Sequence, residues 1–221
     1  MKIRLFYTEI PFWRAEVSRL ALYIGNIDFE DVRMTWREDF DTMIETGKLP
    51  YGVTSPFRQI PVMEVDGQVV GQTGGIARFC GKLSGLYPKN DDMLAAQIDQ
   101  IIDAANDITN LVGLTMREKD LDKRKLERQK LSKEVLPKWF GFLENLLKEN
   151  KSSEWFVGDK MSVADLAIWR LLGWIISGKL EHVPTTLLDT FPKLAKLYKG
   201  VDSHPKVQEW ISLKYPKKYT S

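Results

Sequence analysis

The strongest chemical signal in this sequence is a segment, residues 59–78, that is suited to holding a small, peptide-like anion. Pro61 has no backbone N–H to donate, and the apolar run after it predicts a short strand over residues 62–65. Thr73 stands where a helix N-cap is expected, with two glycines and a helical run behind it. The free backbone amides of such a helix start attract anions. Proline, strand and capped helix together predict an anion-binding site.

The elements that must position this site alternate between strands and helices. Asp66 and Gly67 predict a two-residue hairpin turn of type I′, in which both central residues have a positive φ, and residues 69–70 form the return strand. The apolar pattern predicts further strands over residues 3–7 and 29–35, helices over 13–23 and 74–83, and a helical or irregular segment over 37–48. This βαβ-ββα order predicts a mixed four-stranded sheet with helices on its faces.

The second half of the chain is helical in its pattern. Turn-forming and polar residues at 85–91 indicate a linker. Beyond it, apolar residues recur every three or four positions over residues 93–116, 120–148, 162–177, 191–199 and 204–213. Ser162 and Asp165 have the spacing of a capping box at the start of one of these helices. The sequence thus predicts an α/β domain followed by an all-α domain.

The composition argues against several classes of protein. The 221 residues carry 32 basic and 30 acidic side chains, a net charge of +2, which gives no strong field for nucleic acid or a membrane surface. The longest apolar stretch, residues 166–176, is interrupted by Arg170 and is too short to span a bilayer. Cys80 is the single cysteine, so no internal disulfide can form, and two histidines argue against the usual metal sites. With no secretory signal visible, we expect a cytoplasmic protein without a metal.

The motifs of residues 59–78 resemble those of the cytosolic glutathione transferases. In that family an apolar residue precedes a cis proline, a strand and hairpin follow, and a Gln-Ser pair caps the next helix. Here the pair is Gln72-Thr73, which keeps the hydroxyl. Because a small α/β domain before a helical one is also typical of the family, the resemblance covers nearly the whole chain. It implies a thioredoxin-like domain at residues 1–84, a linker at 85–91 and an all-helical domain at 92–221.

The resemblance implies that glutathione is the co-substrate and that this segment holds its peptide backbone. Ile60, before the cis proline Pro61, would turn its backbone toward the cysteinyl part. Gln72 and Thr73 would hold the γ-glutamyl carboxylate, and Gln59 would meet the peptide or glycyl part. The alternative is an ordinary β-hairpin followed by a capped helix, with no ligand.

Glutathione chemistry also needs a group that stabilises the thiolate, because a free thiol of pKa about 8.5 is only a few per cent ionised at neutral pH. The resemblance implies a hydroxyl at the end of the first strand, where Tyr7 lies. Arg14 precedes Ala-Glu, as an arginine does in sigma-like classes, and is expected to lower the thiol pKa further. The alternatives are structural: a core aromatic residue and a solvated arginine.

The loop between these two residues departs from the sigma-like pattern. It is one residue longer, and bulky Pro11, Phe12 and Trp13 replace an Arg-Gly pair. The hydroxyl of Thr8 is therefore a second candidate for the thiolate donor, because some classes use a serine in this region. Phe12 and Trp13, with Met116 from the first helices of the helical domain, are expected to line an apolar pocket for the electrophile.

The residues expected to bind the glycyl carboxylate differ from those of sigma-like classes. Sigma-like classes use a Trp and a Lys from the second helix, but Phe40 stands near the expected Trp and Ile44 where the Lys would fall. Lys48, in the following loop, is the expected substitute, and Trp36 and Arg58 are alternatives.

Three aspartates, Asp99, Asp103 and Asp107, follow one another at intervals of four residues on one helix face. Like charges at this spacing repel by roughly 0.2–0.5 kcal/mol per pair, so such a row needs partners. In the family, an acid eight residues after an Ile/Val-Asp pair reaches across a two-fold interface to the ammonium of the partner's glutathione. The resemblance gives this role to Asp107 and implies a homodimer. Asp103 would assist or join a divalent-cation cluster, an option that Asn106 weakens, and the alternative for the row is a solvated acidic stripe.

These residues predict a dimeric, sigma-like glutathione transferase that conjugates glutathione to hydrophobic electrophiles, with isomerase or peroxidase activity open to the same thiolate. A non-catalytic relative, such as a lens crystallin of this fold or a transferase-like domain of the translation machinery, is one alternative. A thiol–disulfide oxidoreductase is another, but no cysteine stands at the first helix start. Cys80, inside a helical run, is expected to be packed rather than reactive. The sequence does not identify the electrophile.

Overall fold

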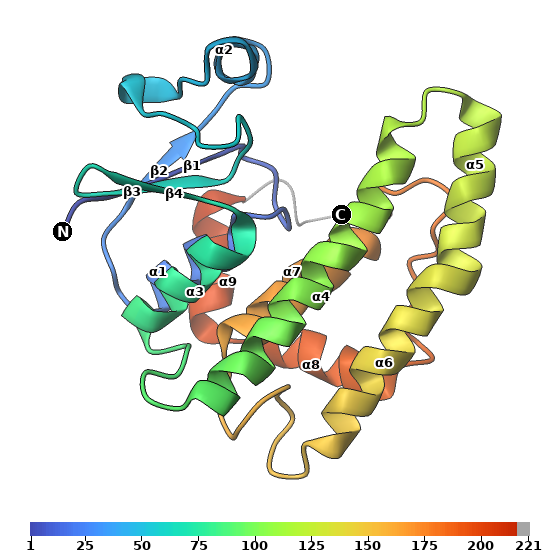
Figure 1. Ribbon diagram of the computed structural model, residues 1–221. Coiled ribbons are helices and arrows are strands. Elements are labelled where there is room, and N and C mark those ends of the chain that lie inside the picture. The colour runs from blue at the N-terminus through green and yellow to red at the C-terminus, as the bar shows by residue number, and fades with distance from the viewer. Residues whose placement is uncertain (216–221) are drawn as a thin grey trace.

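The computed structural model describes residues 1–215, which form two packed halves. A four-stranded sheet with three helices makes up the first half, and helices α4 to α9 make up the second (Figure 1). Helices α1 and α3 lie on one face of the sheet, and α2 lies beyond the other (Figure 1). The prediction of a mixed four-stranded sheet followed by an all-helical part is confirmed.

The sheet has the strand order β2-β1-β3-β4. Its strands are β1 (Ile3–Tyr7), β2 (Glu30–Arg33), β3 (Val62–Val65) and β4 (Gln68–Gly71). Strand β1 runs parallel to β2 and antiparallel to β3, which in turn pairs antiparallel with β4. Asp66 and Gly67 join β3 to β4 with φ values of 48° and 85°, as the predicted type I′ hairpin requires.

Side chains along β1 alternate between two parts of the core. Leu5 and Tyr7 join the large hydrophobic cluster that includes α1 and the helical half. Phe6 faces the opposite way, into a small cluster with Met34 and Met43 beneath α2. The alternation places Tyr7, at the end of the strand, on the face that meets the helical half.

Three helices pack around the sheet: α1 (Glu16–Ile24), α2 (Glu38–Thr46) and α3 (Thr73–Ser84), with a 3-10 turn (Pro50–Gly52) after α2. The predicted N-cap at Thr73 is wrong by one residue, because Gln72 is the cap position and Thr73 is the first residue of the helix. Gln72 has a φ of 72°, which turns the chain sharply after β4 and lets helical geometry begin at the next residue. The Ile60–Pro61 peptide bond is cis, as expected.

The helical half contains α4 (Asp92–Arg117), α5 (Leu121–Lys130), α6 (Leu136–Glu149), α7 (Val163–Ile175), α8 (Pro192–Asp202) and α9 (Pro205–Lys214). The single helical segment predicted over residues 120–148 is two helices joined by a π-helical turn, Leu131–Val135. Pro137, in the first turn of α6, has no N–H for the preceding turn, so regular helical bonding is interrupted there.

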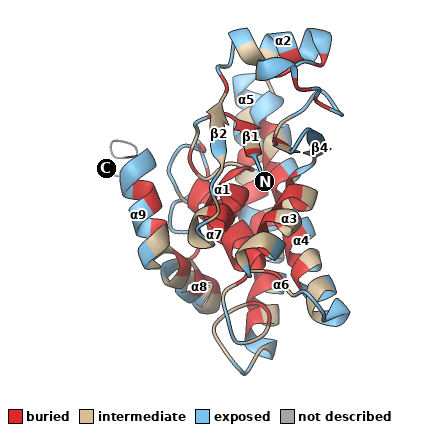
Figure 2. Cartoon of the chain, turned by 90° about the vertical axis from the view of Figure 1, so that its left-hand side faces the viewer, coloured by how far each residue is buried: buried red, intermediate tan, exposed pale blue. Residues whose placement is uncertain are grey.

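Every residue of α7 is buried, so this helix is the centre of the core (Figure 2). The predicted capping box is present at its start. The Ser162 hydroxyl accepts from the Ala164 N–H at 3.2 Å, and the Asp165 carboxylate accepts from the Ser162 N–H at 2.7 Å. Asp165 also accepts from the Phe156 N–H at 2.9 Å, which ties the preceding loop to the helix. These bonds fix the start of the helix that carries Arg170.

Candidate active site

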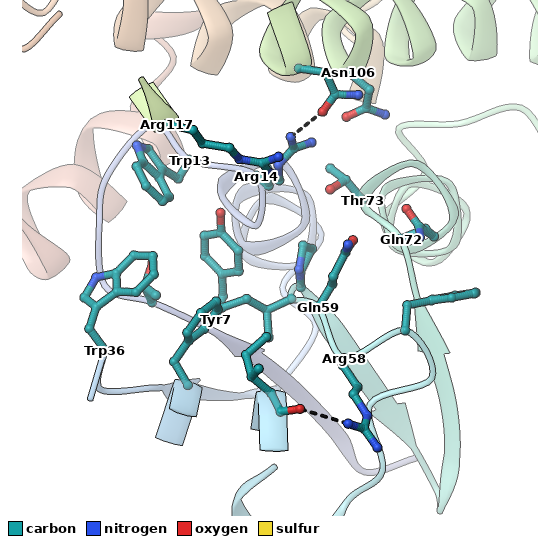
Figure 3. A pocket seen from close by; sticks show the side chains of 17 residues that line it. Tyr7, Trp13, Arg14, Trp36, Arg58, Gln59, Gln72, Thr73, Asn106 and Arg117 are labelled. Atoms are coloured by element: carbon teal, nitrogen blue, oxygen red, sulfur yellow. Dashed lines mark hydrogen bonds between the residues drawn. The ribbon is translucent and has the colours of Figure 1, made fainter. Parts of the chain in front are cut away.

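A cavity of about 690 Å³ opens where the sheet-bearing half meets α4 (Figure 3). The predicted site residues that line it are Tyr7, Trp13, Arg14, Phe40, Gln59, Ile60, Pro61, Gln72 and Thr73. They come from the end of β1, the loop before α1, helix α2, the loop before β3 and the start of α3. The fold therefore brings together residues that are far apart in the sequence.

Tyr7 ends β1, and its hydroxyl points into the cavity toward Arg14 (Figure 3). Burial, the largest influence on the pKa of the Tyr7 phenol, raises it, while the positive charges of Arg14 and Arg170 oppose this rise. The backbone N–H of Arg14 also acts on the phenol oxygen as a hydrogen-bond donor. Tyr7 therefore stays protonated at neutral pH, and its O–H is left to donate to a ligand.

Arg14 lies just before α1 and reaches across to α4, where its Nη2 donates to Oδ1 of Asn110 at 2.7 Å. Burial lowers the pKa of Arg14 most strongly, while Tyr7 raises it and Arg117 lowers it. Within residues 1–215 no carboxylate pairs with the Arg14 guanidinium. Its charge is thus not neutralised and can lower the pKa of a thiol bound beside Tyr7.

Thr8 offers less to a ligand than Tyr7 does. It is 1% exposed, and its Oγ1 is buried without a hydrogen-bond partner in the part of the chain that the structure describes. Thr8 lines only the large cavity, whereas Tyr7 lines both the large cavity and the neighbouring one described below. The geometry favours Tyr7 as the donor and leaves Thr8 as a second hydroxyl in the wall.

The loop before β3 and the start of α3, where the sequence predicts an anion seat, both line the cavity. Thr73 begins α3 and lines the cavity, and the first amides of a helix have no intrahelical partner. Asn106 lines the same cavity, and its Oδ1 is buried without a hydrogen-bond partner among the described residues. Helix amides bind a carboxylate, and an amide oxygen accepts from an ammonium group. The seat therefore fits the amino-acid end of a peptide such as glutathione.

The two cations predicted near the glycyl carboxylate have other partners. The Nζ of Lys48 donates to Oγ1 of Thr54 at 2.8 Å, and Lys48 does not line the cavity, because the chain turns back after α2 and pairs these two residues. Arg58 lines the cavity, but its Nη1 donates to the carbonyl of Ile44 at 3.0 Å, so the guanidinium points toward α2 (Figure 3). The other predicted glycyl partners, Gln59, Phe40 and the alternative Trp36, line the cavity.

A second cavity, of about 490 Å³, adjoins the first. The two cavities share Tyr7, Trp13, Arg14, Trp36 and Arg117. The predicted pocket residue Met116 also lines the second cavity, but Phe12 lines neither. Phe12 has a φ of 61° and packs 4.9 Å from the ring of Trp169. Gly173 makes room for it, since a Cβ there would lie 2.3 Å from the Phe12 ring.

Arg78 of α3 is the partner of two aspartates of the acidic row. Its Nε lies 2.6 Å from Oδ1 of Asp99, and its Nη2 lies 2.9 Å from Oδ1 of Asp103. Asp107 is exposed, has no ion pair within residues 1–215, and lines a third, open cavity of about 450 Å³. Among the described residues no group of three or more His, Cys, Asp or Glu could hold a metal ion, which argues against the cation cluster within one chain.

Several cavity residues were not predicted from the sequence. Asn106, Asn110 and Arg117 lie on one face of α4, and Arg170 and Trp174 come from α7. The spacing of the three α4 residues places them on one side of that helix, but nothing in the pattern tells which side faces a ligand. Arg170 had a visible signal, because a charged residue interrupts an otherwise apolar helix.

Cys80 is fully buried, and burial raises the pKa of its thiol to about 12, so the prediction that it is packed is confirmed. No helix within residues 1–215 is both long and apolar enough to cross a membrane.

Residues 106–214 match the family described as the glutathione S-transferase C-terminal domain. A probable glutathione S-transferase 8 from Caenorhabditis elegans is 33% identical over 218 residues, which cover 94% of each chain. The chain belongs to the glutathione transferase family. The hematopoietic prostaglandin D synthase of Mus musculus is 31% identical over 204 residues, 92% of each chain. The solved prostaglandin synthase D of Nilaparvata lugens has a TM-score of 0.80 and 27% identity, covering 96% of this chain and 98% of that one.

Glutathione transferases use glutathione as their co-substrate. The start of α3, the Oδ1 of Asn106, which has no partner among the described residues, and the protonated phenol of Tyr7 offer groups that suit that molecule. The similarity to the Caenorhabditis elegans protein covers 94% of this chain, so it extends over both the sheet-bearing half and the helical half.

Proposed function

We propose that this protein is a glutathione transferase of sigma-like class that adds the sulfur of glutathione to apolar electrophiles. Tyr7 is the donor that stabilises the thiolate. The position of Tyr7 carries the proposal, because its side chain lines both the cavity at the start of α3 and the adjoining cavity, whose wall includes several tryptophans. The order Arg14-Ala15-Glu16 at the start of α1 supports the class.

Glutathione supplies the sulfur nucleophile when it is bound. Tyr7 donates its O–H toward that sulfur, and the unneutralised charge of Arg14 lowers the thiol pKa, so the proton leaves to solvent near neutral pH. The surrounding aromatic side chains of Trp13 and Trp36 restrict the access of water and hold an apolar acceptor.

The proposal keeps those predicted glutathione contacts whose residues line the cavity. We assign the cysteinyl backbone of glutathione to Ile60 beside Pro61 and the γ-glutamyl carboxylate to Gln72 and Thr73. The glycyl end is assigned to Gln59 and to the aromatic wall of Phe40 and Trp36. Lys48 is not included, because its amine is bonded to Thr54.

The proposal includes a homodimer in which Asp107 reaches the glutathione of the partner subunit. Exposure of Asp107, and its lack of an ion pair among the described residues, support a partner outside this chain. A cytoplasmic location is part of the proposal, since the chain has a single cysteine, Cys80, which is buried, and the fold does not depend on a disulfide.

Replacing Tyr7 and Thr8 one at a time tests the mechanism. Tyr7→Phe removes the donor and is expected to lower kcat with a generic aryl halide by about 100-fold, as the loss of one donor to a developing or full anion does. Thr8→Val is the matched control and should change kcat little. The opposite ranking would make Thr8 the donor, and absence of turnover by the wild-type protein with a panel of electrophiles would favour a binding module.

An isomerase is a second candidate, favoured by the likeness to the hematopoietic prostaglandin D synthase. The same thiolate would add to its substrate and leave again, so glutathione would be required but not consumed. Following free thiol during turnover separates the two reactions.

A further inference from the structure

The second cavity is unusually rich in positive charge. Three arginines line it, Arg14, Arg117 and Arg170, and no aspartate or glutamate is among its lining residues. Arg14 donates to a neutral amide, and Arg117, at the end of α4, has no ion pair within residues 1–215. The charge in this wall is therefore not balanced by the described part of the chain.

Arg170 is the most unusual of the three. It is 1% exposed, and its Nη2 donates to Oγ1 of Thr109 at 2.8 Å, whereas its Nε is buried without a hydrogen-bond partner among the described residues. The Thr109 hydroxyl donates to the carbonyl of Ala105 at 2.6 Å, so Arg170 bonds to a neutral oxygen rather than to a carboxylate.

Arg19 shows how this fold satisfies a buried guanidinium elsewhere. Arg19 is also fully buried, but it pairs with Asp31 at 2.8 Å and with Glu16 at 3.3 Å, and these acids raise its pKa. The pKa of Arg170 shifts in the opposite direction. Burial is the largest cause and the positive charge of Arg14 the next, and together they lower this pKa to about 9. At neutral pH Arg170 is still mostly charged, and a buried charge without a counter-ion is costly.

Apart from the hydroxyls of Tyr7 and Thr109, the side chains that make up the rest of the cavity wall are apolar. Trp13, Trp36, Trp174 and Met116 line the same space of about 490 Å³, which is within the range of small-molecule pockets. A ligand that matches this wall has an apolar body and a single anionic group that reaches the arginines. A carboxylate is the natural partner, since it accepts two hydrogen bonds from a guanidinium.

We propose that the acceptor substrates of this cavity are amphipathic carboxylates, whose carboxylate is bound by Arg170 and Arg117 and whose apolar part packs on the tryptophans. The inference rests on the proposed function only in naming the ligand as the acceptor substrate. The cavity, and the positive charge that no carboxylate within residues 1–215 pairs with, do not depend on that function.

The test compares two ligands with the same ten-carbon chain, decanoate with its anionic carboxylate and decanol with a neutral hydroxyl in its place. Their binding to the full chain is measured without glutathione, by isothermal titration and by the fluorescence of the tryptophans in the wall. One charge-assisted pair predicts that decanoate binds at least about tenfold more tightly than decanol. Equal affinities for the two ligands would overturn the proposal.

Two variants test the assigned residues. Arg170→Met and Arg117→Gln should each weaken decanoate by about tenfold and leave decanol unchanged. Arg117 is exposed, so its variant reports on the site even where Arg170→Met fails to fold. Lys119→Gln is the matched control, because it removes one positive charge from an exposed position outside the cavity. The assignment would be overturned if Lys119→Gln weakened decanoate binding as much as the arginine variants do. It would also be overturned if neither arginine variant weakened decanoate binding.

This readout is independent of catalysis. A chain that binds decanoate selectively but turns over no electrophile would contradict the proposed function and leave the carboxylate site standing. A chain that conjugates neutral electrophiles well but binds decanoate and decanol equally would support the proposed function and contradict the carboxylate site.

Discussion

The guanidinium of Arg14 donates to Oδ1 of Asn110 across 2.7 Å, and this bond joins the sheet-bearing half of the molecule to the middle of α4 in the helical half. Asn110 is neutral, so it orients Arg14 without cancelling its charge. Arg14 also acts on Tyr7, because its backbone N–H donates to the phenol oxygen and its charge lowers the phenol pKa. One residue therefore bonds to the helical half, contacts Tyr7 and brings positive charge to the cavity.

Arg14→Gln should raise the pKa of a bound glutathione thiol by about one unit, because a cation a few ångströms away lowers the pKa of an acid by roughly that amount or more. The thiol is titrated through its ultraviolet absorbance in the presence of saturating glutathione. Arg37→Gln is the control, since Arg37 is exposed at the start of α2 and lines neither cavity. An unchanged titration in Arg14→Gln would remove Arg14 from the mechanism.

Asp107→Asn should raise KM for glutathione by about tenfold with little change in kcat, the loss expected for one charge-assisted hydrogen bond. Asp103→Asn is a matched control one turn away, because Asp103 already pairs with Arg78 in the same chain. Sedimentation of the wild-type protein shows whether it is a dimer. A monomer with unaltered KM in the variant would exclude the role across an interface.

Asp165 should make folding less favourable as the pH rises from about 4 to about 6. Burial raises the pKa of its carboxyl from 3.8 to about 6, against the smaller effect of its hydrogen-bond donors, so the folded chain keeps a proton that the unfolded chain has lost. The stabilisation is fully present below the unfolded pKa and is lost as the pH rises through the folded one, on the order of 3 kcal/mol in all. Urea unfolding of wild type and Asp165→Asn over this range measures it. A difference between the two proteins that does not depend on pH would contradict the prediction.

Ser162→Ala should lower the free energy of unfolding by about 1 kcal/mol, because it removes the hydroxyl that caps α7. Ser162→Thr keeps a hydroxyl and should retain most of that stability. Neither variant should alter KM for glutathione, since Ser162 lies outside the cavities that Tyr7 lines. Equal stability of the Ala and Thr variants would show that the hydroxyl does not cap the helix.

Local patterns of the sequence were enough to predict the parts of the site that depend on neighbours in the chain. The hairpin at Asp66 and Gly67 and the end of β1 at Tyr7 are each set by a few consecutive residues, and the structure has both; the cis bond at Pro61, which the family resemblance implies, is also present. The cap of α3 was displaced by one residue, since the positive φ of Gln72 depends on how β4 meets the helix.

Features set by contacts between distant segments were missed. The sequence predicts Phe12 as a pocket residue. In the structure its ring packs against Trp169 in the helical half, in space that is free because Gly173, far along the sequence, has no side chain. Arg170 is visible as a charge in an apolar helix, but that no described residue gives it an acidic partner is known only once α4 and α7 are packed together.

The central claim is that Tyr7 stabilises a glutathione thiolate, and the ultraviolet difference spectrum of the protein mixed with glutathione tests it most directly. The account predicts thiolate absorbance at neutral pH in the wild type, titrating well below the pKa of about 8.5 of a free thiol, and its loss in Tyr7→Phe. A wild-type spectrum without thiolate at saturating glutathione, or one unchanged in Tyr7→Phe, would contradict it.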